Sequence, residues 1–107
     1  MSAYAMAYLH DVDLGAEIVE YLQRIDATLE PIGGHFLVHG ATPELLEGDD
    51  PGLPIVIEFP SLDQARGWYD SPAYREILPL RTRNARSTTF LIDGVDADHK
   101  ATDVLVA

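Results

Sequence analysis

The sequence contains no cysteine, so disulfide bonds and thiol chemistry are excluded for this chain. Basic residues are also few: 7 lysines and arginines stand against 18 acidic residues, which gives a formal net charge of −11. An electrostatic field of that sign repels phosphate backbones and anionic lipids. We therefore expect no nucleic-acid partner.

Long apolar runs are missing as well. No segment approaches the roughly 20 apolar residues that a membrane-spanning helix needs, so we expect no membrane partner. The first ten residues, MSAYAMAYLH, lack the basic start and the long apolar stretch of a secretory signal. These absences predict a cytoplasmic protein.

Several functional motifs are absent too. The sequence has no GxxxxGK[ST] or GxGxxG loop for phosphates, because Gly33 and Gly34 are followed by a predicted strand, and no GxSxG marks a serine nucleophile. We expect no cofactor.

The length of 107 residues predicts one domain, followed by a short tail. We place the domain at residues 1–95 and the tail at residues 96–107. The tail is polar until Val104, Leu105 and Val106, which we expect to be frayed or packed on a dimer partner.

Apolar spacing predicts four strands and two helical regions. Residues 3–9 alternate small and large side chains, which is typical of a strand. The helix that follows has Ile18, Leu22, Ile25 and Leu29 on one face, with Asp11 or Asp13 as its N-cap and Gly33 and Gly34 at its end. The other predicted strands cover residues 35–39, 55–59 and 87–93. Residues 40–54 are rich in glycine, proline and acid, so we expect an exposed and mobile connection.

The segment from Ile55 to Arg81 is the most informative. Its first five residues form an apolar, β-branched run that predicts a central strand, interrupted by Glu58. Ser61 with Gln64 is typical of a helix start, and Ser71 followed by Pro72 repeats that signal, so the second helical region should break near Asp70.

A family resemblance rests on this segment. The run IEFPSLDQARGWYDSPAY, together with GGHFLVHG before it and LR and DGV after it, resembles the uncharacterised bacterial family DUF 1330 over roughly residues 3–95. The resemblance implies an α+β, ferredoxin-like βαββαβ unit: an antiparallel four-stranded sheet with helices on one face, which pairs through its sheet into a dimeric α/β barrel. Proteins of that architecture include cofactor-independent monooxygenases, muconolactone isomerase and haem-binding proteins. One fold hosts many functions, so the resemblance predicts fold and homodimer more than chemistry.

Glu58 and Arg81 are the first candidate functional pair. One interpretation is a structural salt bridge between the central strand and the end of the second helical region; the other is a functional carboxylate near an arginine that grips a ligand anion. Both interpretations predict that the two residues are energetically coupled.

Aromatic residues and histidines complete the candidate site. Trp68, Tyr69 and Tyr74 suit either the core or the wall of a ligand pocket. His35 and His39 share one face of a predicted strand, but they lie about 13 Å apart along it, which is too far for one metal ion. Since no metal-binding pattern includes His10 either, we expect no metal site.

Two functional hypotheses follow. In the first, the protein is a cofactor-independent enzyme for a small organic acid or aromatic compound, with Glu58, His35 or Tyr74 as catalytic groups. Arg81, Trp68, Tyr69, His10 and His39 would then bind the substrate. In the second, the same residues form a non-catalytic small-molecule-binding or stress-related module. Either hypothesis predicts a pocket that Glu58, Tyr69, Tyr74, Arg81 and at least one of His10, His35 and His39 line.

Overall fold

The computed structural model describes residues 1–105; Val106, the last residue of the predicted apolar tail segment, lies outside them. The elements along the chain are β1 (Ala3–His10), α1 (Ala16–Leu29), the 3-10 helix η1 (Glu30–Ile32), β2 (His35–Val38), β3 (Leu53–Phe59), α2 (Leu62–Tyr69), α3 (Pro72–Thr82), β4 (Arg86–Asp93) and the 3-10 helix η2 (Ala101–Leu105). This order is the predicted βαββαβ pattern, with its second helix divided into α2 and α3.

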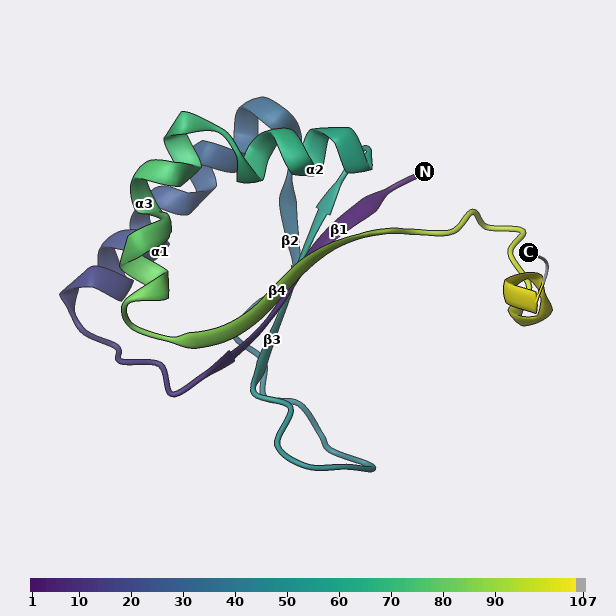
Figure 1. The fold of residues 1–107 in the computed structure, drawn as a ribbon, viewed down its shortest axis with the longest axis horizontal. Coiled ribbons are helices and arrows are strands. Elements are labelled where there is room, and N and C mark those ends of the chain that lie inside the picture. The colour runs from purple at the N-terminus through teal and green to yellow at the C-terminus, as the bar shows by residue number, and fades with distance from the viewer. Residues whose placement is uncertain (106–107) are drawn as a thin grey trace.

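The four strands form one antiparallel sheet in the order β2-β3-β1-β4. The prediction that the Ile55–Phe59 run lies centrally is confirmed, since β3 pairs with β1 on one side and β2 on the other. Figure 1 shows α1, α2 and α3 on the same side of this sheet. We call the side that they cover the helix-covered face and the other side the open face.

Strand β1 divides its side chains by size between the two faces. Ala3, Ala5 and Ala7 pair with Phe59, Ile57 and Ile55 on the helix-covered face, whereas Tyr4, Met6 and Tyr8 point to the open face. The small residues leave space beneath the helices. The large ones make the open face apolar.

The two helix starts predicted after β3 are confirmed. The Ser61 hydroxyl accepts a hydrogen bond from the backbone N–H of Gln64, and the Ser71 hydroxyl accepts one from that of Tyr74, with Pro72 in the first turn of α3. The chain therefore changes direction at Asp70, between α2 and α3.

The predicted cap of α1 is wrong: Gly15 is the N-cap, and no side chain caps this helix. Asp11 and Asp13 are engaged elsewhere. The Asp11 carboxylate faces Arg86 at 3.4 Å, and the Asp13 backbone N–H donates to the Asn84 carbonyl. Both contacts tie the β1–α1 connection to the segment before β4.

The glycine pair before β2 acts as predicted. Gly33 adopts φ 77, and the Gly34 N–H donates to the Leu29 carbonyl, so α1 and η1 end here. A Cβ on Gly34 would lie 2.6 Å from the Phe59 ring, which explains the need for glycine. Strand β2 then ends at Val38 rather than at the predicted His39, after a register shift that begins at Phe36.

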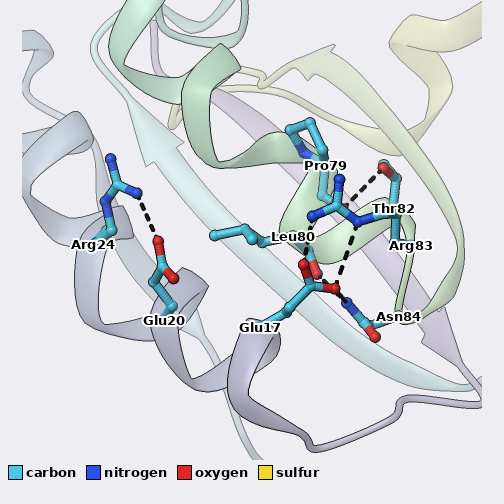
Figure 2. Close-up of polar contacts among 8 residues, drawn as sticks. All are labelled: Glu17, Glu20, Arg24, Pro79, Leu80, Thr82, Arg83 and Asn84. Carbon is cyan, nitrogen blue, oxygen red and sulfur yellow. Dashed lines mark hydrogen bonds and ion pairs between the residues drawn. The ribbon is translucent and has the colours of Figure 1, made fainter.

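The core lies between the sheet and the helices. Its most buried large side chains come from α1, β3 and α3: Leu29, Phe59, Tyr74 and Ile77. Figure 2 shows how Glu17 near the start of α1 accepts hydrogen bonds from Arg83 and Asn84 after α3. These contacts hold α1 and α3 together above the sheet.

The tail leaves this body after β4. The Gly94 N–H donates to the Ser2 carbonyl, and beyond it the chain runs away from the sheet to η2 (Figure 1). Val104 and Leu105 on η2 are exposed. Nothing else in the described residues covers them, so the prediction that a partner subunit packs on this tail stays a prediction.

Candidate functional site

A cavity of about 90 Å³ lies between the sheet and the helices. Ala5 and Ala7 of β1 form part of its floor, where their methyl groups leave room that larger side chains would fill. Its other apolar lining residues come from β1 and the connection after it, from the helices and from β2 and β3, and include Leu9, Ile18, Ile25, Ile55, Ile57 and Trp68. Leu22 and His39 are lining residues that are also exposed, so they mark the side where the cavity opens.

The polar groups of the cavity come from three helices. Tyr21 of α1 and Tyr74 of α3 place their hydroxyl oxygens 2.7 Å apart, within hydrogen-bond distance. Burial, reinforced by Tyr74, raises the pKa of Tyr21, so its hydroxyl keeps its proton at neutral pH. Tyr69 at the end of α2 lies against Tyr74, with ring centroids 5.6 Å apart. Sequence analysis did not select Tyr21, because its spacing on α1 is that of an ordinary core residue.

Arg81 is the only charged side chain among the lining residues of the described chain, and it is 5% exposed. Its Nη1 donates to the Ser87 hydroxyl oxygen at 2.7 Å, which joins the end of α3 to β4. Burial by itself would lower the pKa of Arg81, but the oxygens of Tyr74 and Tyr21 outweigh that effect and raise it. The guanidinium therefore stays charged inside the protein.

Trp68 is placed both in the core and at the cavity. Its indole N–H donates to the Thr28 hydroxyl at 2.9 Å, and its ring lies 4.1 Å from that of Tyr74 between centroids. Thr28 in turn donates to the Ile25 carbonyl. The indole N–H of Trp68 thus has its hydrogen-bond partner on α1, while the Trp68 ring lines the cavity.

Glu58 lies away from this cavity, contrary to expectation. Because side chains alternate along β3 and Ile57 is turned to the helices, Glu58 points to the open face, beside its cross-strand neighbours Tyr4 and His35. Its Oε1 is 2.9 Å from Nε2 of His35. The structure therefore corrects the predicted Glu58–Arg81 pairing: the two side chains lie on opposite faces of the sheet and have different partners.

The histidines are separated in the same way. His39 follows β2, lines the cavity and stacks on Phe36 with ring centroids 4.3 Å apart. His35 lies on the open face, and Nδ1 of His10 at the end of β1 is 3.8 Å from an Asp50 oxygen. In residues 1–105, no three histidine or acidic side chains are grouped so that they could hold a metal ion.

The structure thus brings together five of the eight predicted site residues: Trp68, Tyr69, Tyr74, Arg81 and His39. The other three, Glu58, His35 and His10, are not cavity-lining residues. The arrangement joins an apolar space to one buried cation and two tyrosine hydroxyls. Chemically, it suits a small molecule with an apolar body and a group that accepts hydrogen bonds.

The order and pairing of these elements define the fold class: a ferredoxin-like α+β domain with an antiparallel four-stranded sheet. Residues 2–95 match the model of one family, described as a domain of unknown function (DUF1330), and the chain belongs to that family. The resemblance inferred from the sequence motifs is confirmed. A search of curated proteins found no match.

Solved structures with this fold are distant in sequence. A protein of unknown function from Rhodopseudomonas palustris, RPA0582, aligns with a TM-score of 0.67 and 16% identity over 89% of this chain and 83% of its own. SnoaB, a cofactor-independent oxygenase from Streptomyces nogalater, aligns with a TM-score of 0.55 and 16% identity over 92% of this chain and 96% of its own. These likenesses show the fold alone. No helix in the part of the chain that the structure describes is long and apolar enough to cross a membrane.

Proposed function

We propose that this protein is a homodimer that binds a small organic molecule in the cavity between its sheet and its helices. The observation that carries the proposal is an apolar space of about 90 Å³ beside the tyrosine hydroxyls and Arg81. Protein interiors are close-packed and have few voids larger than a water molecule, so a space of this size with polar groups at one side supports a ligand site.

Trp68 offers a direct measurement of binding. It is the one tryptophan of the chain and it lines the cavity, so its fluorescence should respond when a ligand enters. We expect saturable changes on titration with small acids or their uncharged amides, for which isobutyrate, benzoate, isobutyramide and benzamide are suitable probes. The absence of any saturable response to all four would contradict the proposal.

Ala7→Leu tests whether the ligand occupies this cavity. The larger side chain would fill the floor beneath the helices, so binding should weaken by about tenfold or more while the protein still unfolds cooperatively. Val56→Leu also enlarges an aliphatic side chain but lies on the open face, outside the cavity lining, so it is the control and should bind as the natural sequence does. Equal binding by the two variants would place the ligand elsewhere.

The homodimer is supported by the open face. Tyr4, Met6, Val56, Phe90 and Ile92 give this face an apolar surface that no helix in the described chain covers. A sheet with one apolar face in water is stabilised when a second copy covers that face. Light scattering should therefore give twice the chain mass of 11.8 kDa at micromolar concentration.

A charge on the open face should separate the subunits. Phe90→Asp introduces a carboxylate that would be buried in the interface, so the dimer should dissociate at concentrations where the natural protein is dimeric. Leu46→Asp adds the same charge to the exposed β2–β3 connection and should leave the dimer intact. A folded natural protein that scatters as a monomer would refute the homodimer.

A second candidate function is an enzyme that acts without a cofactor on a small organic acid or aromatic compound. The Tyr21–Tyr74 hydroxyl pair at the cavity favours it, because a hydroxyl beside a ligand is able to transfer a proton. SnoaB, a protein of this fold, is a cofactor-independent oxygenase. Glu58 and His35 stay candidates for a site that a second subunit would enclose on the open face, with His10 at its edge.

Turnover separates the two functions. NMR spectra of isobutyrate and benzoate incubated with the protein should change with time if the protein is an enzyme, and Tyr74→Phe should slow that change. Binding without any turnover of these probes favours the non-catalytic or stress-related module. The cytoplasmic location and the absence of a nucleic-acid partner stay part of the proposal, to be tested by fractionation and by binding to DNA and RNA.

A further inference from the structure

Arg81 is a buried cation with no carboxylate partner in the part of the chain that the structure describes. Among residues 1–105, no acidic oxygen lies within 4.0 Å of its guanidinium, whereas at least one does for each of the other arginines: Arg24, Arg66, Arg75, Arg83 and Arg86. The oxygens that act on Arg81 belong to neutral hydroxyls: Ser87 accepts a hydrogen bond from its Nη1, and the Tyr74 and Tyr21 hydroxyls also interact with the guanidinium. The most buried arginine of the described chain is thus the one whose charge is not matched by an acid.

Such an arrangement is costly for folding unless something else neutralises the charge. Buried charges in proteins are normally paired, because removing an ion from water costs several kcal/mol. The guanidinium carries several N–H donors, and only the one on Nη1 is used by Ser87. Arg81 is a lining residue of the cavity, so a ligand there is able to accept from guanidinium donors that Ser87 and the two tyrosines do not use.

We propose that the ligand of the cavity is a small monocarboxylate, whose carboxylate pairs with Arg81 and whose compact apolar body occupies the space above Ala5 and Ala7. The inference rests on the proposed function and names its ligand class. The Tyr74 hydroxyl, which is hydrogen-bonded to that of Tyr21, would donate a hydrogen bond to the same carboxylate. The ligand would supply the negative charge that the described residues do not place beside Arg81.

A carboxylate fits the site better than a phosphate does. One guanidinium matches the two oxygens of a carboxylate, whereas phosphate sites usually add backbone donors or further cations. Within residues 1–105, Arg81 is the one cationic lining residue, and the other walls are mostly apolar. The volume sets the size of the ligand: about 90 Å³ is less than the about 150 Å³ of an engineered cavity that takes benzene, which favours a short aliphatic chain over an aromatic ring.

The first experiment compares charge at constant shape in the natural protein. Titrations followed by Trp68 fluorescence and by calorimetry would use isobutyrate and its uncharged isostere isobutyramide. We expect isobutyrate to bind about tenfold or more tightly, the advantage of hydrogen bonds to a charged group. Formate and inorganic phosphate test charge without an apolar body and should bind more weakly than isobutyrate.

The second experiment removes the cation. Arg81→Met keeps an apolar side chain of similar length, and replacing a buried charge in this way is often neutral or stabilising, so the variant should fold. It should lose the preference for isobutyrate over isobutyramide. Arg81→Lys keeps the charge but not the planar fork, and should retain part of the preference. Cooperative unfolding checks that each variant is folded.

The outcomes distinguish the two proposals. Equal binding of isobutyrate and isobutyramide by the natural protein would contradict the proposal that the ligand is a carboxylate. The proposal that the cavity binds a ligand would still stand. Formate or phosphate binding as tightly as isobutyrate would overturn the ligand class. If no probe binds, both proposals fail. Retention of the full preference in a folded Arg81→Met variant would show that another group recognises the anion.

Discussion

The two faces of the sheet are built from the same strands and differ in what covers them. On the helix-covered face, small side chains of β1 meet large ones of β3, and α1, α2 and α3 close the layer around a cavity. On the open face, β1 presents Tyr4, Met6 and Tyr8, and no helix of the described chain covers them. Helices of the same chain cover one face, whereas the other face has an apolar surface suited to a second copy of the chain.

The same division separates the two ionic groups that the sequence singles out. Arg81 lies under the helices without an acidic partner among residues 1–105, whereas Glu58 lies on the open face against His35. Residues 57 and 58 are adjacent in the chain, yet one faces the cavity and the other faces away from it. In a strand, a shift of one residue moves a side chain to the other face of the sheet, and so changes the residues that it contacts.

The largest expected effect contrasts two phenylalanines. Phe59→Ala on the helix-covered face removes a fully buried ring and should lower the free energy of unfolding by about 3–5 kcal/mol at every protein concentration. Phe90→Ala on the open face removes a ring that is 37% exposed in one chain, so its cost should grow with protein concentration as the dimer forms.

Urea unfolding of both variants at several protein concentrations measures this contrast. Equal losses that do not depend on concentration would mean that the open face is not an interface.

A smaller effect concerns Tyr21 at alkaline pH. Its pKa is raised in the folded protein, first by burial and then by Tyr74, so folding favours the protonated phenol. The resulting stabilisation is complete below about pH 10, the ordinary tyrosine pKa, and is lost as the pH rises above it. The natural protein should lose up to roughly 1.4 kcal/mol of stability per pH unit in that range through this group.

Tyr21→Phe should remove that part of the pH dependence, at a cost of about 0.5–1.5 kcal/mol at neutral pH for the lost hydrogen bond to Tyr74. Urea unfolding on both sides of about pH 10 provides the measurement. If the two proteins have the same slope above that pH, Tyr21 does not hold its proton in the folded state.

The smallest expected effect is the coupling of Glu58 with its neighbours. A double-mutant cycle of Glu58→Gln with His35→Gln should give a coupling of about 0.2–1 kcal/mol at a pH where His35 is charged, since the pair is partly exposed. The cycle of Glu58→Gln with Arg81→Met should be additive within about 0.5 kcal/mol. A large coupling to Arg81 would restore the cross-sheet pairing that the structure contradicts.

Local patterns in the sequence determined most of the fold. The alternation in residues 3–9, the apolar run before Pro60 and the two serine helix starts depend on neighbours a few residues apart, so they are readable from the chain. The family motifs have the same local character. The cap of α1 was mispredicted: the Asp11 side chain faces Arg86, far away in the sequence, and the Asp13 backbone is tied to Asn84.

The sequence by itself also led to the prediction that Tyr69, Tyr74 and Arg81 line one pocket, since they lie close together in the second helical region. Only the tertiary structure decided which of the remaining candidates join them. Tyr21 reaches the cavity because α1 packs beside α3, while Glu58 is turned away because strand residues alternate between faces whose roles depend on where the helices lie. That placement depends on long-range packing, and packing is a property of the whole chain rather than of any segment.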